Sequence, residues 1–104
     1  MEQAKRAAEA TVTQRIRDEY GGMTSGQRRL ADFVLQNAPE VAMMSSGELA
    51  SVTGMSESSV VRFAQTLGYQ GYPDMRQQLQ QEVLKQFRSS DRVAAMVHSR
   101  PTQD

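Results

Sequence analysis

Apolar residues recur along this chain with the period of an α-helix, and no stretch shows the two-residue alternation of a β-strand. The first helical stretch covers residues 3–20 and ends at Gly21-Gly22. Its apolar stripe repeats every four positions and consists of Ala8, Val12, Ile16 and Tyr20. A stripe this narrow either packs on the domain's own core or pairs with the same helix of a second copy.

Two further helix starts are marked by capping boxes. In a capping box, a Ser or Thr is followed three residues later by Gln or Glu, and each side chain bonds a free backbone N–H of the other residue. Thr24 with Gln27 forms one such box, and Ser45 with Glu48 forms another. We therefore expect a helix to begin at each place.

Proline bounds the remaining helices. Pro39 ends one helix, because it cannot continue the hydrogen-bond ladder, and it suits the first turn of a short helix over residues 40–43. Pro73 suits the start of a last helix in the same way. The apolar stripe of that last helix consists of Met75, Leu79, Val83 and Phe87. The polar residues 88–91 predict a break, followed by one or two turns around residues 93–97.

The most informative stretch is residues 49–67, which predicts two short helices joined by a tight turn. The first helix carries a small apolar patch formed by Leu49, Ala50 and Val52, and it can end at Thr53. Gly54 can close it in the left-handed conformation, which costs glycine nothing. Ser56 is a good N-cap for the second helix.

The second helix has one apolar and one polar face. Its apolar positions follow the i, i+3, i+4, i+7 rule and are Val60, Phe63, Ala64 and Leu67. A small residue at Ala50, glycine at Gly54 and an aliphatic residue at Val60 have the spacing of a helix-turn-helix motif. The alternative interpretation is an ordinary helical hairpin with a glycine corner.

The charge balance argues for modest DNA affinity. The 104-residue chain has a formal net charge of +0, and residues 23–87 contain five basic and six acidic side chains. DNA-binding domains commonly carry a basic surface, because neutralising phosphates supplies much of their affinity. Phosphate contacts here would come from polar side chains and helix N-termini. We therefore expect one copy to bind weakly.

Several function classes have no support in the sequence. The only histidine, His98, lies in a polar tail, and no metal-ligand cluster, phosphate-binding glycine loop or catalytic constellation is present. We expect no enzyme activity, no metal and no cofactor. The chain has no cysteine, no secretory signal and no membrane-spanning run, which predicts a soluble cytoplasmic protein without a membrane partner. A helical protein-interaction or dimerisation module without DNA binding is the main rival.

The central part of the chain, about residues 23–87, resembles the N-terminal DNA-binding domain of RpiR-type transcriptional regulators. The most specific piece is Ser56-Glu-Ser-Ser-Val-Val-Arg-Phe63, followed by the Leu-Gly-Tyr-Gln-Gly-Tyr of residues 67–72. Further matching segments are residues 23–37, 39–41 and 45–50. The chain departs from the family at Gln65, Thr66 and Gln70, which are neutral where relatives often carry lysine.

The resemblance implies an all-α fold, a compact helix-turn-helix (homeodomain-like) bundle of five to six helices. It also implies binding to operator DNA as a homodimer, in a bacterial regulator of carbohydrate metabolism genes. A phosphosugar effector would act only through a C-terminal domain that this chain lacks. We expect residues 1–22 to form a helix and possible dimerisation arm, 23–87 the DNA-binding domain, and 88–104 a linker or tail.

If the second helix enters the major groove, the contact helix is residues 57–67 and its N-terminal residues meet base edges. Arg62 is the best candidate for a specific contact, because its guanidinium can bind guanine O6 and N7; its alternatives are a phosphate contact or an ion pair with Glu57 or Glu48. Tyr69 and Gln70 either bond phosphates or pack their loop on the core. The expected DNA-binding residues are Ser46, Ser56, Glu57, Ser58, Ser59, Arg62, Gln65, Thr66, Tyr69 and Gln70.

Overall fold

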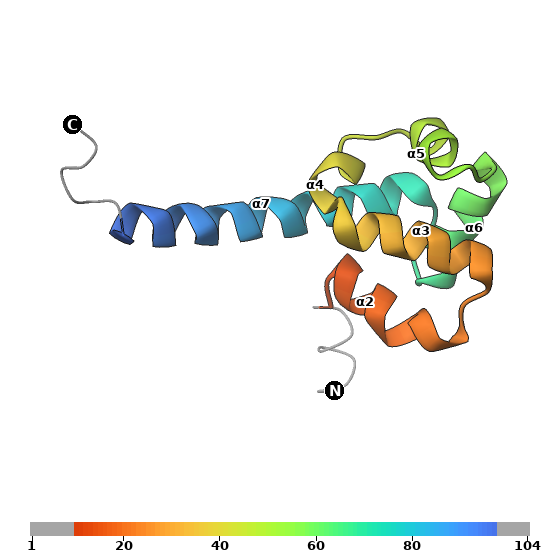
Figure 1. Ribbon diagram of the computed structural model, residues 1–104, viewed down its shortest axis with the longest axis horizontal. Coiled ribbons are helices and arrows are strands. Elements are labelled where there is room, and N and C mark those ends of the chain that lie inside the picture. Colours follow the sequence, from red (N-terminus) through yellow and green to blue (C-terminus); the bar gives the residue numbers. More distant parts are fainter. Residues whose placement is uncertain (1–9, 98–104) are drawn as a thin grey trace.

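The computed structural model describes the backbone of residues 10–97 and the side chains of residues 10–88, and this part of the chain contains helices and no strand (Figure 1). The all-α prediction is confirmed. In order, the helices are α2 (Val12–Glu19), the 3₁₀ helix η1 (Tyr20–Gly22), α3 (Ser25–Gln36), α4 (Ala38–Val41), α5 (Ser46–Thr53), α6 (Glu57–Thr66) and α7 (Tyr72–Val97).

Both predicted capping boxes are present. The Thr24 hydroxyl accepts a hydrogen bond from the backbone N–H of Gln27 at 3.2 Å, and the Gln27 side chain accepts from the backbone N–H of Thr24 at 3.0 Å. Ser45 and Glu48 make the same pair of bonds at 3.1 and 2.9 Å. Local sequence therefore fixes where α3 and α5 begin, whatever packs against them.

The single helix predicted over residues 3–20 is wrong at Thr11, which has an extended backbone and caps α2 by accepting from Gln14 N–H at 3.1 Å. Residues 3–9, with Ala8, lie outside the described residues. Val12 and Ile16 are fully buried in the core of this chain. The described part of the stripe therefore packs on the domain itself.

Two boundaries inside the bundle differ from the prediction. The short helix α4 spans Ala38–Val41, not residues 40–43, because proline fits equally well at its second position, where no N–H bond is needed. Val52 is 51% exposed and does not join the apolar patch of α5. The buried Thr53 takes the inward position instead, and its hydroxyl donates to the Leu49 carbonyl at 2.7 Å.

The break predicted at residues 88–91 is also wrong, since α7 continues without interruption to Val97. No glycine or proline occurs between residues 74 and 97, so nothing in the backbone stops an established helix. The 26 residues of α7 extend over about 39 Å, and its outer half projects from the bundle (Figure 1). Among the described residues, no helix is both long and apolar enough to cross a membrane. His98 and the rest of the polar tail lie outside the described residues.

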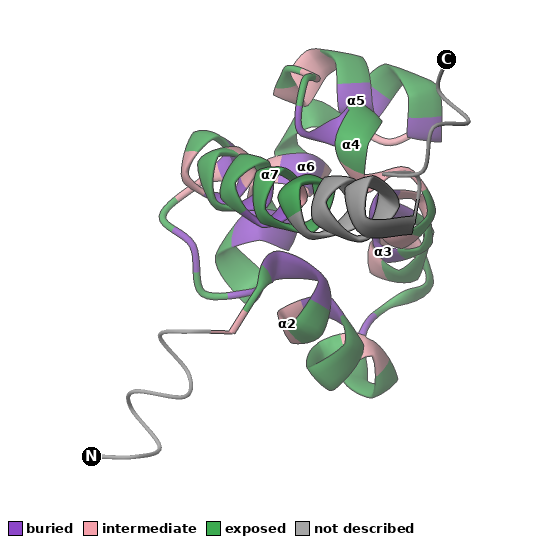
Figure 2. Cartoon of the chain, turned by 90° about the vertical axis from the view of Figure 1, so that its left-hand side faces the viewer, coloured by how far each residue is buried: buried purple, intermediate pink, exposed green. Residues whose placement is uncertain are grey.

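The core lies where the inner half of α7 crosses the other helices, and buried positions face inward on every helix around it (Figure 2). Met75 and Leu79 are fully buried, Val83 is half-buried, and Phe87 is 61% exposed because α7 has left the bundle by that point. The largest fully buried side chains are Phe63, Ile16, Leu30, Leu49, Met75, Leu79, Val12, Val34, Val41 and Val60.

A row of polar side chains on α7 holds the segment between α4 and α5. The Tyr72 hydroxyl lies 2.8 Å from the Met44 carbonyl oxygen and 3.2 Å from that of Val41. One turn apart along the same row, Arg76 donates to the Met44 carbonyl at 3.4 Å and Gln80 donates to the Ala42 carbonyl at 2.9 Å. These bonds pair the carbonyls of Ala42 and Met44, which lie after the end of α4. They also give a second donor to the Val41 carbonyl, which already accepts the Met44 N–H at 3.0 Å.

A buried carboxylate joins α7 to the first turn of α2. Glu82 is only 6% exposed, and its carboxylate accepts hydrogen bonds from the backbone N–H of Thr13, at 3.3 Å, and from the Thr13 hydroxyl. Thr13 is the second residue of α2, where free N–H groups and the helix dipole favour a negative charge. The contact therefore fixes α2 on the bundle and compensates for the burial of the charge.

We predict that Tyr72→Phe lowers the free energy of unfolding at neutral pH by ~1–2 kcal/mol, because buried carbonyls lose a donor. Burial also raises the pKa of Tyr72 from 10.0 to about 12. Folding thus favours the protonated phenol. The contribution of the Tyr72 hydroxyl to the free energy of unfolding is therefore complete below pH 10 and is lost as the pH rises through about 12. Urea unfolding from pH 8 to 12 should show a steeper loss for the wild type than for the variant. Parallel curves would contradict this assignment.

Candidate nucleic-acid interface

The turn between α5 and α6 has the predicted left-handed glycine. Gly54 has φ +72°, and its N–H caps α5 by bonding the carbonyls of Ala50 and Ser51. Met55 follows and donates its backbone N–H to the Ala50 carbonyl at 2.9 Å. Its side chain reaches α3, where a Cβ added to Gly26 would lie 2.8 Å from the Met55 methyl carbon. The corner is therefore packed closely against α3 and cannot pivot freely.

The two motif helices pack through the residues that their spacing predicted. Ala50 is 5% exposed and Val60 is fully buried, so the small residue and the aliphatic plug both lie in the interface between α5 and α6. Phe63 and Ala64 are buried beside them and attach α6 to the core. Together with the glycine turn, this geometry is a helix-turn-helix and not merely a helical hairpin.

The opposite face of α6 is exposed and polar, as a helix that enters a DNA groove requires. Its exposed residues are Glu57, Ser58, Arg62, Gln65 and Thr66. Arg62 is the only basic side chain on this helix. Between residues 10 and 88 no ion pair joins Arg62 to Glu57 or Glu48. The guanidinium is therefore available to a ligand.

The serines at the start of α6 are partly engaged with one another. The Ser56 hydroxyl accepts from the backbone N–H of Ser59 at 3.1 Å and lies 3.0 Å from the Ser59 hydroxyl. Ser56 therefore acts as the predicted N-cap, and Ser59 is half-buried beside it. Ser58 is exposed. Of the three serines, Ser58 offers its hydroxyl most openly.

Ser46 and Glu57 are brought together by the fold although they belong to different helices. The Ser46 hydroxyl donates to one carboxylate oxygen of Glu57 at 2.9 Å. The same carboxylate lies over Gly47, where an added Cβ would stand 3.4 Å from it. The carboxylate thus sits at the N-terminus of α5, which favours negative charge, and its position relative to α6 is set.

Tyr69 and Gln70 form the loop after α6, and their backbone N–H groups are already used. Tyr69 N–H donates to the Ala64 carbonyl at 3.1 Å, and Gln70 N–H donates to the Asp74 carboxylate at 3.0 Å. The Tyr69 ring is buried, with the Arg15 guanidinium 4.9 Å from its centroid, and burial raises the pKa of its hydroxyl. Tyr69 therefore packs the loop on the core, and only the Gln70 side chain is presented to solvent.

Sequence reasoning missed the N-terminus of α3 as a neighbour of this face. A hollow of about 190 Å³ lies between α3 and α6, lined by Thr24, Gly26, Gln27, Leu30, Met55, Ser59 and Arg62. The Gln27 amide bridges the two helices by donating to the Thr66 hydroxyl at 3.4 Å. The capping box at Thr24 was the available signal, because the free N–H groups of a helix start attract phosphate.

The described residues offer no metal centre beside this face, since no three His, Cys, Asp or Glu side chains among them are grouped to hold an ion. The arrangement consists instead of one exposed arginine, one positioned carboxylate, and hydroxyl and amide groups. Such groups can accept from and donate to base edges and phosphates. They form no nucleophile–base pair.

The comparisons agree with this geometry. A profile of the helix-turn-helix domain of the rpiR family matches residues 10–86. The chain is 40% identical over 72 residues to the uncharacterized HTH-type transcriptional regulator YfhH of Escherichia coli (strain K12), an alignment covering 69% of this chain and 26% of that protein. The chain thus spans about a quarter of the length of this relative. Because the profile covers most of the chain, from α2 into α7, this protein belongs to the rpiR family of helix-turn-helix domains, which bind DNA and are not enzymes.

Proposed function

We propose that this domain binds a pseudo-palindromic operator as a homodimer, with α6 of each copy in the major groove. The observation that carries the proposal is the exposed polar face of α6, fixed on a closely packed turn and core. A helix held in this way can present the same side chains to DNA at every encounter, which specific readout requires.

Arg62 is the proposed base-reading residue at the centre of this face. Its fork can bind O6 and N7 of guanine with two hydrogen bonds. Glu57 has one carboxylate oxygen bonded to Ser46 and can accept from cytosine N4 with the other. Ser46 would then have two roles: its hydroxyl positions the Glu57 carboxylate, and it lies near a DNA phosphate. Gln65, Thr66 and Gln70, exposed on the same side, are proposed to contact the backbone.

The low charge of the domain supports dimeric binding. Few exposed cations face the DNA, so each copy releases few counterions and gains little affinity from phosphates. In a dimer, binding of one copy to its half-site holds the second copy at a high effective concentration near the other half-site, which raises the overall affinity. The proposal extends to a regulator of carbohydrate genes, whose phosphosugar effector would bind a separate C-terminal domain.

A second candidate function is a helical interaction module that binds protein and not DNA. The net charge of +0 and the exposed apolar residues of α7 favour it. The two functions differ in their salt dependence. DNA binding weakens as salt rises, because counterions compete for phosphates, whereas an apolar protein contact responds little.

We predict that Arg62→Ala weakens operator binding by ~1–3 kcal/mol, because a two-bond contact to guanine is lost. The measurement is fluorescence anisotropy at two salt concentrations, with the DNA upstream of the protein's own gene and a scrambled duplex. Arg17→Ala is the matched control, since Arg17 is exposed on α2 and loses the same charge. Equal losses for both variants, or an unchanged affinity for Arg62→Ala, would reject the proposed role.

We predict that Glu57→Gln changes the base preferred at one position of each half-site. An amide keeps an acceptor for Ser46 but can also bind adenine N6 and N7, whereas a carboxylate prefers a cytosine amine. Selecting bound sequences from random duplexes measures this change. If the variant selects the same sequences and only binds all DNA more tightly, Glu57 merely joins α5 to α6 and repels phosphates.

A further inference from the structure

Four large apolar side chains are exposed among the described residues, and they gather in two places. Met43 and Val52, at 82% and 51% exposure, belong to the α4–α5 side of the bundle. Leu84 and Phe87, at 45% and 61%, lie on the outer half of α7. Each pair exposes apolar area that stabilises nothing within the monomer.

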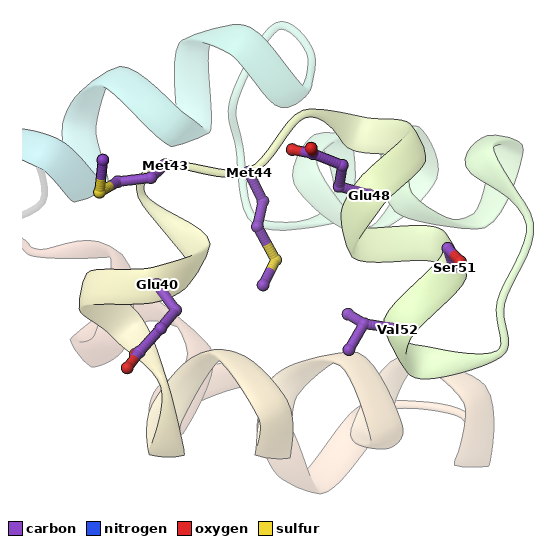
Figure 3. A pocket seen from close by; sticks show the side chains of 6 residues that line it. All are labelled: Glu40, Met43, Met44, Glu48, Ser51 and Val52. Carbon is purple, nitrogen blue, oxygen red and sulfur yellow. The ribbon is translucent and has the colours of Figure 1, made fainter.

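The first pair borders an open groove of about 520 Å³ between α4 and α5. Figure 3 shows Met44, from the connecting segment, and Val52, from α5, directed into this groove. Its lining residues are Glu40, Met43, Met44, Glu48, Ser51 and Val52. Both carboxylates are exposed, so the groove has an apolar floor and an acidic rim. Methionine side chains are flexible and adapt well to an inserted apolar partner.

The second pair continues the row of α7 that faces this region. Tyr72, Arg76 and Gln80, spaced four residues apart, bond the carbonyls between α4 and α5. At 3.6 residues per turn, Leu84 lies about 40° and Phe87 about 20° around the helix axis from Gln80, so both extend that face beyond the bundle. Arg88, about 80° from Gln80, borders the face beside Leu84. Arg88 stands about 12 Å beyond Gln80 along the axis and is exposed. The outer α7 therefore carries an apolar surface bordered by the basic side chain of Arg88.

The acidic groove and the exposed Arg88 of the outer α7 are complementary in charge, but lie at different positions on one chain. In a two-fold symmetric dimer, residue i of one copy meets residue j of the other, and the reverse contact forms at the same time. An acidic patch and a basic patch on one surface are then self-complementary. Both contacts bury apolar area, which supplies most of the association free energy.

We propose that the outer part of α7 in one copy docks in the Met43–Val52 groove of a second copy, with Arg88 facing Glu40 across the interface. This contact would be the dimer interface of the proposed DNA-binding regulator. The inference rests on the proposed function only for the role of the dimer, not for the contact itself. The apolar stripe of α2 is a poorer surface, because Val12 and Ile16 are fully buried within their own chain.

The first test is sedimentation of the full chain over a wide concentration range, with Phe87→Ser as the variant. Phe87 is mostly exposed, so its loss should leave the thermal unfolding of the monomer nearly unchanged. We expect the dimer dissociation constant to rise on the order of 100-fold, since a two-fold interface loses the side chain twice. A wild type that stays monomeric, or a variant that dimerises as before, would overturn the proposal.

The second test exchanges charge. Arg88→Glu and Glu40→Arg should each weaken self-association, because each homodimer then contains two like-charge pairs. Mixing the two variants should restore dimers, since both pairs in the heterodimer are again opposite in charge. Arg17→Glu is the matched control: it makes the same charge change at an exposed position of α2, outside both proposed contact surfaces. Destabilised folding of either variant could not explain the recovery of dimers in the mixture. Its absence would contradict the Arg88–Glu40 pairing.

DNA separates this inference from the proposed function. If both hold, Phe87→Ser binds a duplex carrying one half-site as the wild type does, but loses cooperative binding to two half-sites. If the wild type dimerises through α7 and binds no DNA in preference to scrambled duplex, the proposed function fails and the interface stands. If it binds a single half-site without ever forming dimers, the interface fails and DNA binding stands.

Discussion

The carbonyl groups of Ala42 and Met44, in the segment between α4 and α5, accept hydrogen bonds from α7, and the arrangement of the rest of the domain depends on these bonds. A buried carbonyl without a hydrogen-bond donor is costly. Tyr72, Arg76 and Gln80 bond this segment, so the start of α5 is placed relative to α7. Because α6 packs on both α5 and α7, the orientation of its exposed face follows from these bonds.

The exposed face of α6 is held by a closely packed turn and core, and it carries little charge. Gly54 and Met55 fix the angle between the motif helices, and Glu57 reaches back to Ser46 at the start of α5. A domain with this balance gains specificity from positioned hydrogen-bonding groups and little affinity from phosphate attraction. Such a domain benefits from a second copy more than a strongly basic one does.

In α7 one continuous helix serves two purposes, because nothing in its sequence interrupts it. Its inner half buries Met75 and Leu79 in the core, and its outer half carries the exposed Leu84 and Phe87 away from it. In the proposed dimer, a helix that is rooted in the core would transmit the position of the partner to the DNA-binding face. A flexible linker at residues 88–91 would not do so.

The sequence by itself determined the all-helical fold, the starts of α3, α5 and α6, and the motif. It did not determine the start of α2, the bounds of α4 or the unbroken length of α7. Capping boxes and the Gly54 turn depend on neighbours within a few residues, so local pattern suffices. Apolar spacing likewise identified Val60 and Phe63 as core. The tertiary structure alone decided which exposed or polar positions find partners: the buried pair of Glu82 with Thr13, the bond from Ser46 to Glu57, the burial of Tyr69 and the exposure of Val52. Each of these depends on packing against another helix or loop, which no periodicity encodes.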